Sequence, residues 1–366
     1  MDAEYVKEGT MNFLSTKASL LTPYVAGIQP QEGGWIKLNT NENPYPPSPA
    51  VSEALKNADI TRMKLYPDGN SMELCRAIAR NFNVDEECVF CGNGSDEVIA
   101  LAYQAFFSGK DNVAAPSISY AFYPVWGNMF DVSMSMIPLR DDYCIDADDY
   151  KNANGVIIAN PNAPTGIVLN LQEIETIAQN NPNGVVIIDE AYLDFAEVKS
   201  AIGLINKFDN LLVIRTFSKS HSLAGMRIGY AIGNTELIGG LFRMKNAFNS
   251  YPLDMLAQIA AAAAIKDVEY WNETRRKIIS IREKTAKSLR SAGLFVPSSQ
   301  ANFLFVGLKN AAELYEYLLS EKILVRHWNN PELSEFIRVS IGLDEEMEAF
   351  VKCVKQFLKE KPMKHM

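Results

Sequence analysis

Cysteine is scarce in this sequence, and its few copies do not form a disulfide pattern. The five cysteines, an odd number, are Cys75, Cys88, Cys91, Cys144 and Cys353. Cys88 and Cys91 form a C-x-x-C pair, but no second pair and no histidine stands at the spacing of a zinc site. We therefore expect reduced cysteines, no metal site and a cytoplasmic location.

Long hydrophobic runs and an excess of basic residues are also missing. No run approaches the roughly 18 apolar residues of a membrane span, so none is expected. The stretch Met1–Glu4 does not open a basic segment followed by an apolar one, so no secretion signal is expected. The net charge of −9 argues against nucleic acid as a partner, because basic surfaces bind phosphate backbones.

The composition is that of a folded enzyme with a large core. Of the 366 residues, 48% are apolar and 22% are charged, which is ordinary for a globular protein. The length suggests about two domains.

The stretch Leu211–Tyr230 combines a buried strand with a polar tip. Leu211–Ile214 is fully apolar, and a polar tip follows at Arg215–Lys219. Ligands bind at the carboxyl ends of strands in open α/β sheets, so Lys219 is placed to meet one. A lone lysine there is usually a solvated loop residue. The spacing S-K-x-x-x-L-A-G-x-R-x-G, which includes Arg227, instead favours a phosphate-bearing aldehyde cofactor held by an amine and by cationic donors.

A second strand ends in a carboxylate. Val185–Ile188 is apolar and runs into Asp189. Burying a carboxylate is costly unless it is paired, and a protonated pyridine nitrogen would be such a partner. Tyr192, three residues later, could donate to an oxygen on the same ring. The alternative is an aspartate that caps the next turn.

Both motifs resemble those of pyridoxal-phosphate aminotransferases with the aspartate-aminotransferase fold, and within them the histidinol-phosphate aminotransferases. The resemblance implies an α/β fold whose large domain has a mostly parallel seven-stranded sheet flanked by helices, beside a smaller α+β domain. We expect an N-terminal arm at 1–45 that is part of the small domain, the large domain at 46–250 and the rest of the small domain at 251–366. The resemblance also implies a homodimer with shared active sites.

The resemblance also assigns residues to the cofactor phosphate. A glycine turn feeds a helix N-terminus at Gly92–Glu97, an arrangement that suits a phosphate and departs from the dinucleotide fingerprint. It matches the family's G-x-[AS]-D-E, which implies contacts from Ser95 and Asp96, joined by Ser218 and Arg227. Tyr66, in a family motif where Leu65 replaces the usual arginine, would reach the phosphate of the neighbouring subunit.

Other family positions concern the cofactor ring and the substrate. Tyr120 would stack on the pyridine ring. The usual P-N-N-P-T-G asparagine is Ala163 here, so either Asn162 takes over its contact or the contact is absent. The arm motifs T-P-Y and N-E-N-P imply substrate contacts from Tyr24 and Asn41. Two strand arginines, Arg326 and Arg338, would bind a phosphate or a carboxylate, although a structural salt bridge would explain either one alone.

The resemblance implies a reaction as well. Lys219 would act as the amine that binds pyridoxal phosphate and then as general base, with Asp189 and Tyr192 completing the catalytic group. The substrates would be L-histidinol phosphate and 2-oxoglutarate, in histidine biosynthesis. A threonine-phosphate decarboxylase and an aromatic or aspartate aminotransferase use the same lysine and stay open as alternatives. A non-catalytic regulator on this fold would need an additional binding module, for which the chain has no spare segment.

Overall fold

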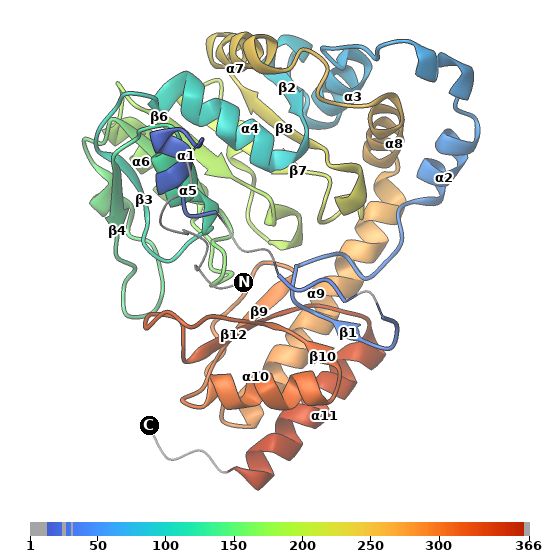
Figure 1. The fold of residues 1–366 in the computed structure, drawn as a ribbon, viewed down its shortest axis with the longest axis vertical. Coiled ribbons are helices and arrows are strands. Elements are labelled where there is room, and N and C mark those ends of the chain that lie inside the picture. The colour runs from blue at the N-terminus through green and yellow to red at the C-terminus, as the bar shows by residue number, and fades with distance from the viewer. Residues whose placement is uncertain (1–12, 24–26, 31, 362–366) are drawn as a thin grey trace.

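The computed structural model describes residues 13–23, 27–30 and 32–361, which form a larger and a smaller lobe (Figure 1). The prediction of Tyr24 as a substrate contact lies outside the described residues. Within the described ranges, no helix combines the length and the apolar character needed to cross a membrane.

The larger lobe is built on a seven-stranded sheet, as expected. The strand order is β2-β8-β7-β6-β5-β3-β4. β8 runs antiparallel to both of its neighbours, and all other pairs are parallel. In chain order, the strands are β2 (Val89–Gly92), β3 (Val113–Pro116), β4 (Met134–Ile137), β5 (Gly155–Ala159), β6 (Val185–Asp189), β7 (Leu211–Thr216) and β8 (Gly229–Gly233).

Successive apolar side chains in each strand point to opposite faces of the sheet, so a hydrophobic core packed with helices lies on each face. Ile188 belongs to the core on one face and Ile187 to the core on the other. Helices α2 (Pro49–Lys56), α3 (Met72–Phe82), α6 (Leu171–Asn180) and α8 (Met255–Lys266) contribute to the first core. Helices α4 (Gly94–Ala102), α5 (Phe122–Met129) and α7 (Thr235–Phe248) contribute to the second.

The smaller lobe combines an antiparallel sheet with three helices. Its sheet has the order β11-β12-β9, formed by Arg326–His327, Phe336–Ser340 and Phe303–Gly307. Its helices are α9 (Val268–Ser291), α10 (Ala311–Ser320) and α11 (Asp344–Glu360). A short parallel pair joins β1 (Ile36–Lys37) to β10 (Ile323–Leu324), so the N-terminal segment pairs with the C-terminal part of the chain. The short helix α1 (Thr16–Leu20) precedes this segment and lies near α5 (Figure 1).

Candidate active site

A cavity of about 810 Å³ has walls from both lobes and from the N-terminal segment. Its size is within the range of small-molecule sites. It brings together most of the residues predicted from the sequence, namely Asn41, Ser95, Asp96, Tyr120, Asp189, Tyr192, Ser218, Lys219, Arg227, Arg326 and Arg338.

Lys219 and Asp189 reach this cavity from neighbouring parallel strands. β6 ends at Asp189, and β7 ends at Thr216, three residues before the lysine. The Lys219 ammonium donates a hydrogen bond to the carbonyl oxygen of Thr40 at 3.3 Å and lies 5.5 Å from the centre of the Tyr192 ring. The sheet therefore positions one amine and one carboxylate at the same edge, as the sequence predicted.

The Asp189 carboxyl group is buried but retains hydrogen-bond donors. Its oxygens accept from the Tyr123 hydroxyl at 3.0 Å and from the Ala191 amide at 3.1 Å. Burial raises its pKa to about 6, while these two donors and the Lys219 charge act in the opposite direction. A carboxyl group with this pKa can hold a cationic ring nitrogen at neutral pH.

A buried ionic cluster supports the lysine loop from the other side of β7. Arg215 lies inside β7 and is 5% exposed, so the prediction that the strand ends before it is wrong. Its guanidinium pairs with Asp194 and lies 3.8 Å from Glu190. Asp194 also accepts a hydrogen bond from Ser220, the residue after Lys219. Burial lowers the pKa of Arg215, but Asp194 and Glu190 raise it further, so the guanidinium stays charged within this strand.

Three of the predicted phosphate contacts, Ser95, Asp96 and Arg227, lie together at the N-terminus of α4. Arg227 pairs with Asp96 at 3.1 Å, and Gly94 has a φ of +80°, which favours glycine. A side chain at Gly94 would collide with the Arg227 guanidinium, and one at Gly229 would collide with the backbone of Ser95. The backbone therefore approaches closely where a helix N-terminus and an arginine meet. This cradle fits a phosphate group.

The aromatic residues of the site lie near the carboxylates of Asp96 and Asp189. Tyr120 donates to Asp96 at 2.8 Å and packs edge-on against Tyr123, with ring centres 5.6 Å apart. Tyr192 packs edge-on against Phe303 of β9, with ring centres 5.0 Å apart. The large lobe and the small lobe thus both fix the position of Tyr192.

The structure does not bring Asn162 into the cavity. It is 1% exposed, and its amide donates to the Ile118 carbonyl at 2.9 Å and accepts from the Ser119 hydroxyl at 2.7 Å. Ala163 forms part of the cavity wall in its place. The amide group of Asn162 is therefore committed to holding the loop after β3.

Arg326 and Arg338 are paired across the small sheet. They are register partners in β11 and β12, and both face the cavity. The Arg338 guanidinium donates to the carbonyl oxygen of Asn39 at 3.0 Å and lies 5.4 Å from the centre of the Phe303 ring. Two guanidinium groups on one wall can bind an anionic substrate group.

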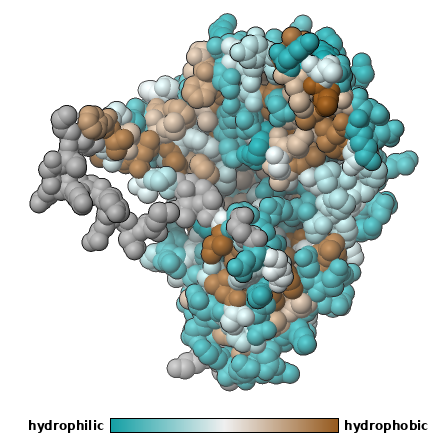
Figure 2. Space-filling view, turned by 45° about the vertical axis from the view of Figure 1, so that its right-hand side comes forward, coloured by the Kyte–Doolittle hydropathy of each residue, from teal (hydrophilic) through white to brown (hydrophobic). Residues whose placement is uncertain are grey.

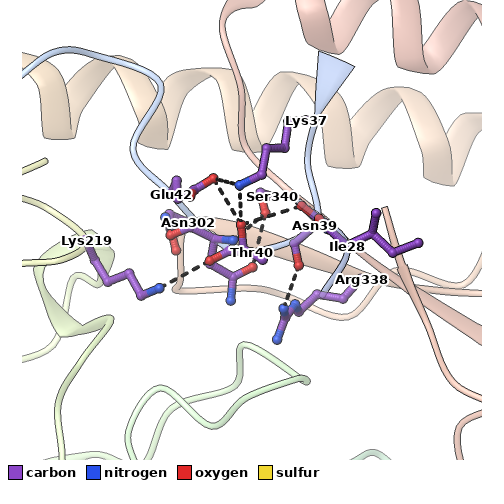
Figure 3. A network of polar contacts seen from close by, with 10 residues as sticks. Ile28, Lys37, Asn39, Thr40, Glu42, Lys219, Asn302, Arg338 and Ser340 are labelled. Atoms are coloured by element: carbon purple, nitrogen blue, oxygen red, sulfur yellow. Dashed lines mark hydrogen bonds and ion pairs between the residues drawn. The ribbon is translucent and has the colours of Figure 1, made fainter. Parts of the chain in front are cut away.

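The N-terminal segment crosses the cavity between these groups. Figure 3 shows Lys219 reaching it from one side and Arg338 from the opposite side. Asn41, in this segment, is 1% exposed and has a left-handed backbone with φ of +54°. Its amide nitrogen donates to the Tyr192 hydroxyl at 3.0 Å. The segment therefore contacts the lysine, the tyrosine and one of the two arginines.

Tyr66 lies away from the cavity walls of its own chain. It is 82% exposed and stacks on Tyr251, with ring centres 4.7 Å apart. A contact between Tyr66 and the cofactor would therefore require a second copy of the chain.

Sequence reasoning missed several residues that shape the site. The sequence does not mark Tyr123 as a site residue, because a tyrosine among apolar residues is usually part of the core. Trp328 and Glu332 line the cavity from an irregular loop after β11, where neither periodicity nor a motif marks them. Arg215 could have been found, since an arginine directly after a buried apolar run needs a partner.

Known proteins resemble this chain in sequence and in fold. Residues 33–354 match the family model described as aminotransferase class I and II. A histidinol-phosphate aminotransferase of Brachyspira hyodysenteriae is 48% identical over 351 residues, covering 95% of this chain and 99% of that protein.

Solved structures share the fold. The histidinol-phosphate aminotransferase from Clostridium acetobutylicum has a TM-score of 0.81 at 27% identity, covering 88% of this chain and 99% of that one. The histidinol-phosphate aminotransferase from Sinorhizobium meliloti, solved in complex with pyridoxal-5'-phosphate, has a TM-score of 0.85 at 23% identity, covering 97% and 100%. The chain therefore belongs to the family of class I and II aminotransferases, in which its relatives are histidinol-phosphate aminotransferases, as the sequence motifs predicted.

Proposed function

We propose that this protein is a pyridoxal-phosphate-dependent aminotransferase that transfers the amino group of L-histidinol phosphate to 2-oxoglutarate. The products are imidazole acetol phosphate and glutamate, in histidine biosynthesis. The observation that carries the proposal is the meeting of Lys219, Asp189 and Arg227 in one cavity between the lobes. The 48% identity to a histidinol-phosphate aminotransferase supports the substrate.

The residues present fit pyridoxal phosphate at both ends. Ser95, Asp96, Ser218 and Arg227 would hold its phosphate at the N-terminus of α4, and Asp189 would hold its ring nitrogen. When bound, the cofactor supplies an aldehyde that accepts the amino group and a ring that withdraws electrons from the substrate carbon.

The protein supplies the proton transfers and the orientation. The Lys219 amine, which lies at the cavity wall beside Tyr192, would take the proton from the substrate Cα. Asp189 would keep a positive charge on the ring nitrogen, and the Tyr192 hydroxyl would donate toward the ring oxygen. Tyr120 would pack on the ring.

The arginine pair would bind the anionic end of each substrate in turn. Arg326 and Arg338 form one wall, and an amino donor with a phosphate and an acceptor with a second carboxylate both present anions there. Both substrates can therefore use one pocket.

We further propose a cytoplasmic homodimer in which Tyr66 contacts the cofactor phosphate of the partner subunit. Large apolar side chains are exposed just before Tyr66 in the chain, at Ile60, Met63 and Leu65. Phe248, three residues before the Tyr251 ring on which Tyr66 stacks, is exposed as well. Brown, apolar areas are visible on the large lobe in Figure 2. A surface of this kind supports an interface. Mixing Tyr66→Phe subunits with Lys219→Ala subunits should yield dimers whose activity departs from the average of the two parents, whereas a monomer that stays active on dilution would contradict the proposal.

A coupled assay tests the function directly. The purified protein with pyridoxal phosphate should turn over histidinol phosphate continuously only when 2-oxoglutarate is present, and faster than it turns over aromatic amino acids or aspartate. Release of carbon dioxide from threonine phosphate without a keto acid would instead identify a decarboxylase. Faster turnover of an aromatic amino acid or of aspartate would move the substrate assignment to that class.

A further inference from the structure

Asn41 has a partner for each of its polar groups, and the partners come from both lobes. Its backbone amide donates to the Ser340 hydroxyl at 2.8 Å, and its backbone carbonyl accepts from Asn302 at 3.0 Å. Its side-chain oxygen accepts from Ser340 at 3.2 Å, and its side-chain nitrogen donates to Tyr192 at 3.0 Å. Ser340 and Asn302 belong to the small lobe, whereas Tyr192 follows β6 of the large lobe.

These contacts fix which end of the Asn41 amide faces Tyr192. The Ser340 hydroxyl accepts the Asn41 backbone proton and donates its own proton to the Asn41 side-chain oxygen. The NH₂ end is then left facing Tyr192. An NH₂ group can only donate, so the Tyr192 oxygen must be the acceptor of this bond.

The direction of this bond leaves the Tyr192 proton available to the cavity. A hydroxyl has one proton, and here that proton is not used toward Asn41. Tyr192 lines the cavity, so its proton can be donated there. The need for this donor is greater because Ala163 stands where the family pattern has an asparagine, and Asn162 is bonded to Ile118 and Ser119 instead.

We infer that Asn41 is a positioning residue that sets the hydrogen-bond direction of Tyr192, so that the tyrosine donates into the cavity. This inference rests on the proposed function, in which Tyr192 donates to the cofactor ring oxygen. It gives Asn41 a task other than direct contact with the substrate. The left-handed backbone at Asn41 is part of this arrangement, because asparagine adopts it more readily than most residues do.

Two substitutions of Asn41 show whether the direction of its hydrogen bond with Tyr192 matters, or only the presence of a side chain in contact with Tyr192. Asn41→Asp is nearly isosteric but offers only acceptors, so Tyr192 would donate its proton to the new carboxylate and lose it for the cavity. Asn41→Gly removes the side chain, tolerates the positive φ and leaves the Tyr192 proton free. Asn39→Asp is the charge control, since it adds a carboxylate two residues earlier on the same cavity wall.

The first measurement is made on the full-length protein without added cofactor. Tyrosines are labelled with ¹³C at Cζ, and the Tyr192 signal is identified by its loss in Tyr192→Phe. In Asn41→Asp the signal should move toward the phenolate position, because the hydroxyl becomes a donor to a carboxylate. In Asn41→Gly and Asn39→Asp no such move is expected. Equal signals in Asn41→Asp and Asn41→Gly would overturn the inference, whatever the enzyme's substrate proves to be.

The second measurement uses the holoenzyme. Asn41→Asp should lower kcat as much as Tyr192→Phe does, by about 10²-fold if one preorganised donor is lost, and should change KM little. The double variant should be no slower than either single variant, because both changes remove the same donor. A larger loss in Asn41→Gly than in Asn41→Asp, or additive losses in the double variant, would contradict the assigned role.

Discussion

The Tyr123 hydroxyl donates a hydrogen bond to the Asp189 carboxylate at 3.0 Å, and both residues are buried. A hydrogen bond to the charged form of an acid lowers its pKa. Tyr123 therefore opposes the burial that raises the pKa of Asp189 to about 6. The pair keeps the carboxyl group ionised near neutral pH, which the proposed role of Asp189 requires.

Removing this donor should shift the titration of Asp189. We expect Tyr123→Phe to raise the pKa of Asp189 above about 6 by one to two pH units, since a hydrogen bond to a charged group contributes about 1.5–3 kcal/mol. The measurement is ¹³C NMR of the aspartate carboxyl carbons, with the Asp189 signal identified in Asp189→Asn. An unchanged titration would show that Tyr123 has no influence on the acid.

Arg338 should matter more for substrate affinity than for turnover. Arg338→Lys keeps the charge but loses the planar fork, so KM for histidinol phosphate should rise by about tenfold, the equivalent of one charge-assisted hydrogen bond. Arg76→Lys is the matched control, because Arg76 is exposed and pairs with Glu86 at 2.7 Å away from the cavity. Equal effects of the two changes on KM would argue against an anion site at Arg338.

Glu190 should make stability depend on pH. Burial raises its pKa to about 7, although Arg215, Ser200 and the Ala201 amide lower it. Between pH 4.5, which is the usual pKa of the group, and about pH 7, the folded state binds a proton that the unfolded state does not bind. The contribution of Glu190 to stability is therefore fully present below pH 4.5 and is lost as the pH rises through 7.

Glu190→Gln should remove this dependence. The free energy of unfolding is measured with urea at pH 5 and at pH 8. From pH 5 to pH 8 it should fall by about 2–3 kcal/mol less in the variant than in the parent protein. Burial lowers the pKa of His221 to about 4, so His221 makes stability rise with pH. Because His221 is present in both proteins, its effect cancels when variant and parent are compared at the same pH. Identical pH profiles would contradict an ionisable Glu190.

Much of this architecture follows from local patterns in the sequence. The apolar runs before Asp189 and Lys219 appear as β6 and β7. Ser48 caps α2, and the helix expected after Gly92–Glu97 is present as α4, which already begins at Gly94 within that stretch. These features are local, because periodicity, turn residues and caps act within a few positions of the chain.

Features that depend on distant contacts were not predictable in the same way. The bond between Asn41 and Tyr192 joins positions 151 residues apart, and that between Tyr123 and Asp189 joins positions 66 apart. The sequence could indicate that Arg215 needs an acidic partner but not which one, because Asp194 and Glu190 reach it only once β6 and β7 are paired. Motif spacing also cannot show that Asn162 faces Ile118 and Ser119 and not the cavity.

The most direct test of the account asks which residue binds the cofactor. The protein is incubated with pyridoxal 5'-phosphate, reduced with sodium borohydride and digested, and the labelled peptide is identified by mass spectrometry. We expect one label, on Lys219. The Lys219→Ala variant should take up no label there and should lose at least about 10³-fold in turnover, the scale of a general base. A label on another lysine, or a Lys219→Ala variant with undiminished turnover, would contradict the account.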